Sequence, residues 1–339
     1  MRLLQAMGGA RHGGAEEFFV RFALAMQRAG QDQRVLVRHA AHTERLRAGG
    51  VAVAELPFGG FFDLATTRGM AKAIADYRPD IVLTWMSRAT QLCPPGDFVH
   101  VARLGGYYKL RNYRRCDHLI GNTRDLVESF LAQGWPAERA HYLPNFVDAR
   151  PADPISRAAH ATPEGVPLAL ALGRLHANKA FDMLLAATAR VSGLHLWLAG
   201  AGELRTALEA QAAALGIAER VRFLGWREDV PALLASADFL VCPSRHEPLG
   251  NVVIEAWAAG LPVVAAASIG PRALVVDGKT GLLAPVDDAP ALAAAMARLA
   301  QDPALRRRLA AAGRAAYEAE FTEAQIIRRY QDFFAEVVR

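Results

Sequence analysis

Two glutamates, Glu247 and Glu255, stand eight positions apart around a turn that contains Gly250. The apolar run 252–259 predicts a helix that begins near Asn251 and carries Glu255. The first turn of a helix presents unpaired N–H groups and the positive end of its dipole, which together favour a phosphate. Carboxylates on both sides of a phosphate site suit a ligand with hydroxyl groups at both ends of a diphosphate. The pattern therefore indicates a nucleotide-sugar.

The same two carboxylates could instead form the acid–base pair of a glycosidase. Such pairs stand about 5–9.5 Å apart. The eight-residue separation corresponds to about 12 Å of helical rise. This distance favours contacts with two ends of one ligand over a shared acid–base reaction.

A second group of charged residues, Arg174 and Lys179, follows the predicted strand 168–172. A nucleoside diphosphate gains negative charge as it leaves a sugar, and fixed cations stabilise that charge. Arg174 can bind two oxygens at once, whereas Lys179 supplies a point charge. Taken alone, such a pair could equally be an ordinary basic loop on the surface.

Four glycines lie between residues 7 and 16, where the first predicted strand turns into a helix. Glycines allow the backbone to approach a ligand closely. Gly8 and Gly13 have the spacing of a P-loop but lack the Lys-Ser/Thr that must follow, and Arg205 replaces the third glycine of a dinucleotide fingerprint at 200–205. Neither of those two motifs is therefore assigned.

Residues 242–265 resemble the E-x7-E signature of the GT-B fold retaining glycosyltransferases of family 4, also called glycosyl transferases group 1. The shared positions include Glu247-Pro-x-Gly, Glu255-Ala and Ala-x-Gly-x-Pro-Val-Val-Ala. Residues 172–180 are similar to the family's Gly-Arg-Leu-x-x-x-Lys-Gly element, with Ala180 in place of the last glycine. Weaker similarities extend this resemblance over nearly the whole chain, at residues 143–148 (with Phe146 in place of a glycine), 221–226 and 281–287.

The resemblance implies a retaining glycosyltransferase built from two Rossmann-like α/β domains that face each other across a cleft. It implies that Glu247 contacts the donor sugar, that Glu255 contacts the ribose, and that Arg174 and Lys179 hold the diphosphate. Further donor contacts are implied for Gly13, Gly14, Leu249, Gly250 and Asn251. No metal ion or other cofactor is expected, because the nucleoside-diphosphate-sugar is itself the co-substrate. Alternatives are a GT-B enzyme of another class, such as a sugar-nucleotide epimerase or phosphorylase, and a non-catalytic nucleotide-sugar-binding protein.

The acceptor side is less determined by the sequence. His100 and Arg103 lie at a strand where the family often places an active-site histidine, and either could contact the acceptor or the donor phosphate. His12 lies beside the glycine turn. His246 precedes Glu247 and is a candidate for the sugar pocket. For His100 and His12 a purely structural role is an equally good interpretation.

Strands and helices alternate along the chain, which predicts parallel α/β sheets. The proline-rich segment 150–165 is expected to link a first domain, 1–149, to a second, 166–321. The amphipathic helix expected at 322–339 is implied by the resemblance to cross back to the first domain. Predicted strands of the first half are 2–7, 34–38, 51–56, 81–85, 99–104 and 118–121.

A basic and aromatic segment at 107–115 interleaves three tyrosines with four cations. Residues 1–149 hold nineteen Lys and Arg against fourteen Asp and Glu, whereas the remainder is neutral. An anionic membrane surface or an anionic glycan or glycolipid acceptor would suit this segment, and an ordinary solvated loop is the alternative. No motif of a nucleic-acid-binding module is present, so nucleic acid is not expected as a partner.

Composition places the chain among globular proteins, with 52% apolar and 22% charged residues. Its three cysteines show no paired spacing, which favours a reducing compartment. Neither a secretory leader nor a membrane-spanning run is expected from the apolar pattern. We therefore expect a cytoplasmic enzyme that is either free or peripheral on the inner face of the membrane.

Overall fold

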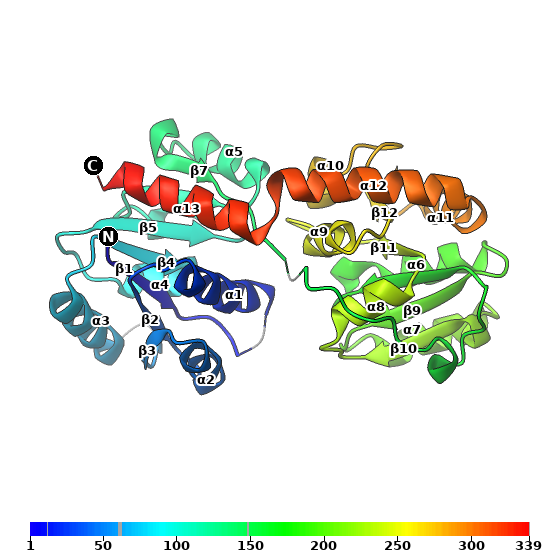
Figure 1. Cartoon of the computed structure of the whole chain (residues 1–339), viewed down its shortest axis with the longest axis horizontal. Helices are drawn as coiled ribbons and strands as arrows, with labels where there is room; N and C mark the ends of the chain where they lie inside the picture. The colour runs from blue at the N-terminus through cyan, green and yellow to red at the C-terminus, as the bar shows by residue number, and fades with distance from the viewer. Residues whose placement is uncertain (12, 60–62, 148, 339) are drawn as a thin grey trace. The chain divides into compact units, whose positions relative to one another are not determined.

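The computed structural model describes residues 1–11, 13–59, 63–147 and 149–338, which form two compact units (Figure 1). Unit 1 comprises Met1–Phe146 together with Glu323–Arg339, and unit 2 comprises Val147–Thr322. The chain therefore passes from one unit to the other twice.

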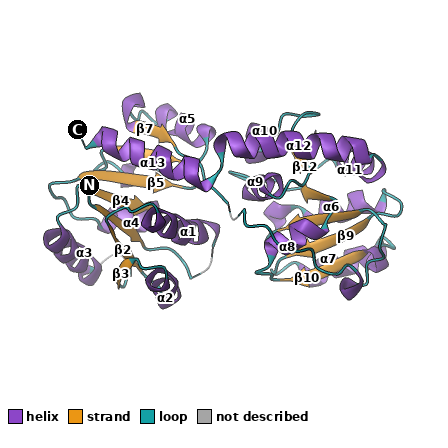
Figure 2. Ribbon diagram, in the orientation of Figure 1, coloured by secondary structure: helices purple, strands orange, loops and turns teal. Residues whose placement is uncertain are grey.

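Unit 1 is built around a seven-stranded parallel sheet in the order β3-β2-β1-β4-β5-β6-β7 (Figure 2). Every neighbouring pair of these strands is parallel; in register, Leu3 of β1 lies opposite Gln33 of β2 and Ile81 of β4. The strands are β1 (Leu3–Met7), β2 (Gln33–Val37), β3 (Ala52–Glu55), β4 (Ile81–Trp85), β5 (Val99–Leu104), β6 (His118–Gly121) and β7 (Ala140–Tyr142). The helices are α1 (Gly14–Arg28), α2 (Ala40–Ala48), α3 (Leu64–Tyr77), α4 (Met86–Leu92), α5 (Arg124–Ala132) and α13 (Glu323–Val337).

Alternate residues of β1 enter different hydrophobic clusters, because successive side chains of a strand point to opposite faces. Leu3 and Met7 join the cluster that contains the aromatic residues of α1 and α13, whereas Leu4 and Ala6 join the cluster that contains α3. Figure 1 shows α1 and α13 side by side over one face of this sheet. Since both faces are covered, β1 is buried along its whole length, as strands of parallel sheets usually are.

Unit 2 repeats this plan with a six-stranded parallel sheet in the order β10-β9-β8-β11-β12-β13. Its strands are β8 (Leu168–Leu172), β9 (His195–Ala199), β10 (Val221–Gly225), β11 (Phe239–Cys242), β12 (Val263–Ala266) and β13 (Leu282–Ala284). Its helices are α6 (Phe181–Ala189), α7 (Arg205–Ala214), α8 (Val230–Ser236), α9 (Asn251–Ala258), α10 (Ile269–Leu274), α11 (Ala289–Gln301) and α12 (Pro303–Glu320).

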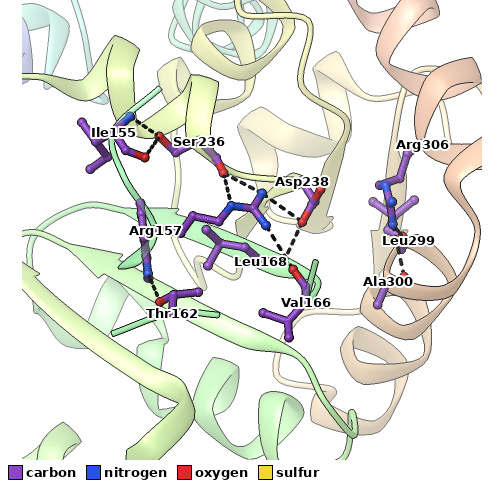
Figure 3. Close-up of polar contacts among 11 residues, drawn as sticks. Ile155, Arg157, Thr162, Val166, Leu168, Ser236, Asp238, Leu299, Ala300 and Arg306 are labelled. Carbon is purple, nitrogen blue, oxygen red and sulfur yellow. Dashed lines mark hydrogen bonds and ion pairs between the residues drawn. The ribbon is translucent and has the colours of Figure 1, made fainter. Parts of the chain in front are cut away.

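The segment that precedes β8 is bound to unit 2 (Figure 3). The guanidinium of Arg157 donates to the main-chain oxygens of Ser236 and Val166 and contacts the carboxylate of Asp238. The N–H of Ile155 donates to the Ser236 hydroxyl at 2.8 Å. These bonds attach the proline-rich segment to the end of α8 and the start of β11.

The expectation of two parallel α/β folds is confirmed. The sequence did not predict the short elements α2, α4, α10, β7 and β13. Within the described ranges, no helix is both long enough and apolar enough to cross a membrane.

Candidate donor site in unit 2

The strand order of unit 2 reverses between β8 and β11. Strands β9 and β10 extend the sheet from β8 in one direction, and β11, β12 and β13 extend it in the other. The loops that follow β8 and β11 therefore diverge, and ligands of open α/β sheets bind in the crevice that forms at such a point. Arg174 and Lys179 follow β8, and Glu247 follows β11.

Lys179 and Glu247 form an ion pair between Nζ and Oε2 across this switch point. Their side chains are only 24% and 13% exposed, so solvent screens the pair less than it would a surface pair. Burial alone would lower the pKa of Lys179, but the charge and hydrogen bond of Glu247 outweigh burial, and the pKa lies above its usual value. Lys179 is therefore a fixed positive charge near neutral pH. Glu255 also contributes to this rise, so its carboxylate lies within electrostatic reach of Lys179.

Arg174 differs from Lys179 because it is exposed and forms no ion pair with any residue in the described ranges. Its loop is held by glycines. Gly173 has φ of +148°, and a Cβ on Gly200 would lie 1.8 Å from the main-chain oxygen of Gly173. The N–H of Gly173 donates to the main-chain oxygen of Ala199 at the end of β9, and the N–H of Leu175 donates to that of Ala201, each at 3.0 Å. The Gly200 turn thus has a structural role, which is to fix the loop that carries Arg174.

The N-terminus of α9 lies beside Glu247. Gly250, with φ of +84°, is the N-cap of the helix and has no side chain with which to cap the first turn. The Gly250 N–H donates to Glu247 Oε1 at 3.4 Å. Asn251 and Glu255 are half-buried and lie one turn apart on the same face of α9. The helix thus begins at Asn251, near the residue that the sequence predicted, between Glu247 and Glu255 in the chain.

Leu249 can contribute only its main chain to a ligand, because its side chain belongs to the hydrophobic core. A Cβ on Gly270 would approach the Leu249 carbonyl group at 2.5–2.6 Å, so this turn packs directly on the start of α10. His246 has an exposed side chain, and its N–H donates to the Asn178 oxygen at 3.2 Å. His246 therefore links the turn of Lys179 to the loop of Glu247 through the main chain.

Arg245 is a residue that the sequence analysis missed. Its guanidinium binds both oxygens of Asp182 at 2.8 and 2.7 Å, Asp287 Oδ1 at 2.5 Å and the Ala177 oxygen at 3.0 Å. Hydrogen bonding to Arg245 holds the pKa of Asp182 below its usual value. Ala177 begins the short helical turn Ala177–Lys179, so Arg245 joins that turn to the loop of Glu247. An arginine beside the motif was the only sequence signal for this role.

The glycine turn of unit 1 lies at the corresponding switch point, between β1 and β4. A Cβ on Gly9 or Gly13 would come within 2.4 or 2.3 Å of the carboxylate oxygens of Glu16, whereas a Cβ on Gly14 would meet nothing within 4 Å. Glu16 is buried and accepts the Ala10 N–H at 2.8 Å. Glu16 therefore holds the turn in place through its carboxylate, a role that was not predicted from the sequence. His12 lies outside the described residues.

His100 and Arg103 are buried and bonded within unit 1. His100 Nε2 lies 3.0 Å from the Thr84 hydroxyl, and burial lowers its pKa to about 4. Arg103 Nε donates to the Tyr330 hydroxyl at 2.8 Å, and its guanidinium lies over the ring of Trp85. These contacts favour the structural interpretation of His100 and give Arg103 the role of joining β5 to α13.

Comparisons with solved structures identify the fold. The structure superimposes on that of Anabaena HepE in complex with UDP and glucose with a TM-score of 0.84, at 22% identity over 99% of this chain and all of that one. It superimposes on the lipopolysaccharide outer core galactosyltransferase WaaB with a TM-score of 0.77, at 16% identity over 99% of this chain and all of that one. The fold is therefore that of the GT-B glycosyltransferases.

Sequence profiles identify the family. The profile described as Glycosyl transferases group 1 matches residues 166–302, and that of Glycosyltransferase Family 4 matches residues 12–150. The chain is 35% identical to the lipopolysaccharide core biosynthesis glycosyltransferase LpsE of Rhizobium meliloti over 96% of both chains. The chain belongs to glycosyltransferase family 4 and is a glycosyltransferase.

Proposed function

We propose that this enzyme transfers a sugar from a nucleoside diphosphate to a hydroxyl group of a lipopolysaccharide core or related cell-surface glycan, with retention of anomeric configuration. The observation that carries the proposal is the Lys179–Glu247 pair at the switch point of unit 2. The 35% sequence identity to LpsE over 96% of both chains supports a lipopolysaccharide acceptor.

Charge stabilisation is the proposed source of catalysis. Arg174 and Lys179 neutralise the leaving diphosphate, and the N–H groups at the start of α9 add dipolar support. Because two fixed cations supply this stabilisation, the proposed reaction requires no divalent ion. Turnover that survives excess EDTA would support this part of the proposal, and loss that added Mg²⁺ restores would refute it.

The two glutamates have separate proposed tasks. Glu255 accepts from the ribose hydroxyls, so Glu255→Gln should weaken binding of the nucleoside diphosphate by about 1.5–3 kcal/mol. Glu247→Gln should leave that binding nearly intact and lower turnover, because its proposed partner is the donor sugar. Calorimetry with the bare nucleotide distinguishes the two, and equal losses of affinity would reject this division.

A donor panel tests the reaction itself. UDP-sugars come first, since HepE was solved with UDP and glucose. We expect release of the nucleoside diphosphate that depends on an acceptor glycan, and a product whose anomeric signal in proton NMR keeps the configuration of the donor. Tight donor binding without acceptor-dependent release would favour the non-catalytic alternative. A sugar-nucleotide epimer or a sugar phosphate as product would identify another class of enzyme.

We also propose that the reaction takes place in the cytoplasm, with unit 1 docked on the inner face of the membrane. The excess of five positive charges in residues 1–149 supports this, since each cation near an anionic surface contributes about 1 kcal/mol. The protein should sediment with phosphatidylglycerol vesicles at low salt, remain in solution with phosphatidylcholine vesicles, and dissociate as salt rises. A protein that ignores anionic vesicles at low salt would refute docking.

A further inference from the structure

A pocket of about 440 Å³ lies in unit 1, between the short helical turn Leu110–Asn112 and the end of α5. Three cations line it, Lys109, Arg111 and Arg114, together with Gln133 and Trp135. No carboxylate is among these described lining residues. The pocket is thus concave, positively charged and partly aromatic.

The three cations of the pocket have no acidic partner among the described residues. Lys109, Arg111 and Arg114 are exposed, and none forms an ion pair with a residue in the described ranges. By contrast, the neighbouring Arg115 donates to the Gln91 oxygen at 2.9 Å and does not line the pocket. The segment therefore separates into three available cations and one that is engaged elsewhere.

The dipole of α5 does not account for three cations. A helix C-terminus carries about half a negative charge. Its last carbonyl groups also have partners already, since Phe130 O accepts the Trp135 N–H at 3.0 Å and Leu131 O accepts the Gly134 N–H at 2.9 Å. The positive charge at this pocket exceeds what the helix end requires.

Hydrogen bonds fix the walls of the pocket. The Trp135 indole N–H donates to the Arg139 oxygen at 3.0 Å, and Arg139 in turn donates to the Cys116 oxygen at 2.7 Å. On the facing side, Tyr113 is fully buried and its hydroxyl lies 2.7 Å from that of Ser87. These contacts anchor the Trp135 ring and the chain that carries Arg111 and Arg114.

We propose that this pocket binds an anionic sugar of the acceptor glycan, one that carries a phosphate or carboxylate group. The volume is typical of small-molecule pockets and far exceeds the roughly 30 Å³ that a water molecule occupies, so a bare ion would leave it largely unfilled. The cations match the anionic group, and the half-buried Trp135 ring offers an apolar surface to the sugar ring. The proposal rests on the proposed function, since it assumes a glycan acceptor.

The test uses the indole signals of the full-length protein labelled with ¹⁵N-tryptophan, with the Trp135 signal assigned from Trp135→Phe. Glucose 6-phosphate and galacturonate should shift the Trp135 signal saturably, whereas glucose should not, and inorganic phosphate should bind more weakly than glucose 6-phosphate. Arg111→Gln and Arg114→Gln should each weaken binding of glucose 6-phosphate about tenfold, the effect of one lost charge-assisted bond.

Arg115→Gln is the matched control, because it removes the same charge from the same segment without changing the pocket lining. It should leave the affinity for glucose 6-phosphate unchanged. An equal loss in this variant would show that diffuse charge, and not the pocket, attracts the ligand, and this would overturn the proposal. Inorganic phosphate that binds as tightly as glucose 6-phosphate, or no saturable shift at all, would also overturn it.

The titration needs no turnover, so it reports on the pocket separately from the proposed reaction. If the protein released no nucleoside diphosphate from any donor, the proposed function would be refuted, but the measured affinities for the pocket would remain valid. When turnover is found, Arg111→Gln should raise KM for the natural acceptor and leave KM for the donor unchanged. A rise in KM for the donor instead would overturn the assignment to the acceptor.

Discussion

The two switch points of this enzyme have the same topology but carry different chemistry. In unit 2 the loops after β8 and β11 carry an exposed arginine and a half-buried lysine–glutamate pair. In unit 1 the loop after β1 is rich in glycine and is held by the buried Glu16, and the turn after β4 contains Met86 with φ of 60°. The switch point of unit 2 is organised to bind a charged group. The switch point of unit 1 is organised to hold a compact main-chain turn.

The largest expected effect follows from removing the charge that sets the two regions apart. Lys179→Ala should lower kcat about 100-fold or more, the scale of one lost group that stabilises developing charge. Steady-state kinetics with a folded variant provide the measurement. As a control, Arg115→Gln removes a cation of unit 1 that has no donor role and should leave kcat unchanged. Wild-type turnover in Lys179→Ala would show that the charge in unit 2 has no special role in catalysis.

Acid should affect unit 1 before unit 2. Burial lowers the pKa of His100 and of His141 to about 4, below the value near 6.5 of an unfolded chain, so folded unit 1 binds fewer protons. The stability that these two histidines contribute to unit 1 is therefore fully present above pH 6.5, and it is lost as pH falls from 6.5 towards 4. The fully buried His100 alone should contribute about 3 kcal/mol to this loss.

Denaturant titrations from pH 7 to 4 test this, with amide exchange used to assign transitions to each unit. In unit 2, the half-buried His195 also has a pKa that burial lowers, so one histidine there acts in the same direction. A His100→Gln variant should lose less stability on acidification than the wild-type protein. Unit 2 unfolding first in acid would contradict the comparison.

A smaller effect is expected from the arginine that holds the charged site in place. Arg245→Met should lower kcat/KM about tenfold. The variant loses four hydrogen bonds, to Ala177, Asp182 and Asp287, and the ion pair of Lys179 is then less well positioned. The matched control is Arg227→Met, which breaks an ion pair with Asp229 in the same unit and should be nearly neutral. Partial recovery in Arg245→Lys, and a weaker effect of Arg245→Met in an Asp182→Asn background, would identify a positioning role. Equal activity losses at Arg245 and Arg227 would exclude it.

The smallest effect distinguishes two adjacent glycines of unit 1. Gly13→Ala places a methyl group against Glu16 and should cost about 1 kcal/mol of stability. Gly14→Ala meets open space at the first position of α1 and should be neutral or slightly stabilising. Thermal unfolding of the two variants gives the comparison, and identical melting temperatures would show that the turn tolerates a side chain.

More could be inferred from the sequence about the charged site than about His100 and Arg103, for a physical reason. Lys179 and Glu247 stand in motifs that resemble those of the family, at fixed spacings from predicted strands, and the resemblance implies their contacts with the donor. His100 and Arg103 carry equally suggestive chemistry, but their surroundings decide their roles, and burial against Thr84 and Tyr330 depends on long-range packing. Arg245 was missed for the same reason.

Regular elements follow a similar division. Helix α13, which has a continuous apolar stripe, was predicted at 322–339 and is found at Glu323–Val337. The short helix α10 contains Gly270 and Pro271, which normally interrupt a helix, and it is held by packing of Gly270 against Leu249 and Glu247. The three-residue strands β7 and β13 are too short to show a period and are defined by their pairing with β6 and β12.

The division of unit 1 between two parts of the chain has a consequence for biosynthesis. Helix α13 supplies Tyr330, Phe333 and Phe334 to the core of unit 1, yet the ribosome makes it after all of unit 2. Unit 2 is continuous in sequence and can fold as soon as it emerges, whereas the earlier-made strands of unit 1 must wait with part of their apolar face uncovered. We therefore expect unit 2 to complete its folding before unit 1, the reverse of the usual order, and unit 1 to be the part of the nascent chain more exposed to aggregation.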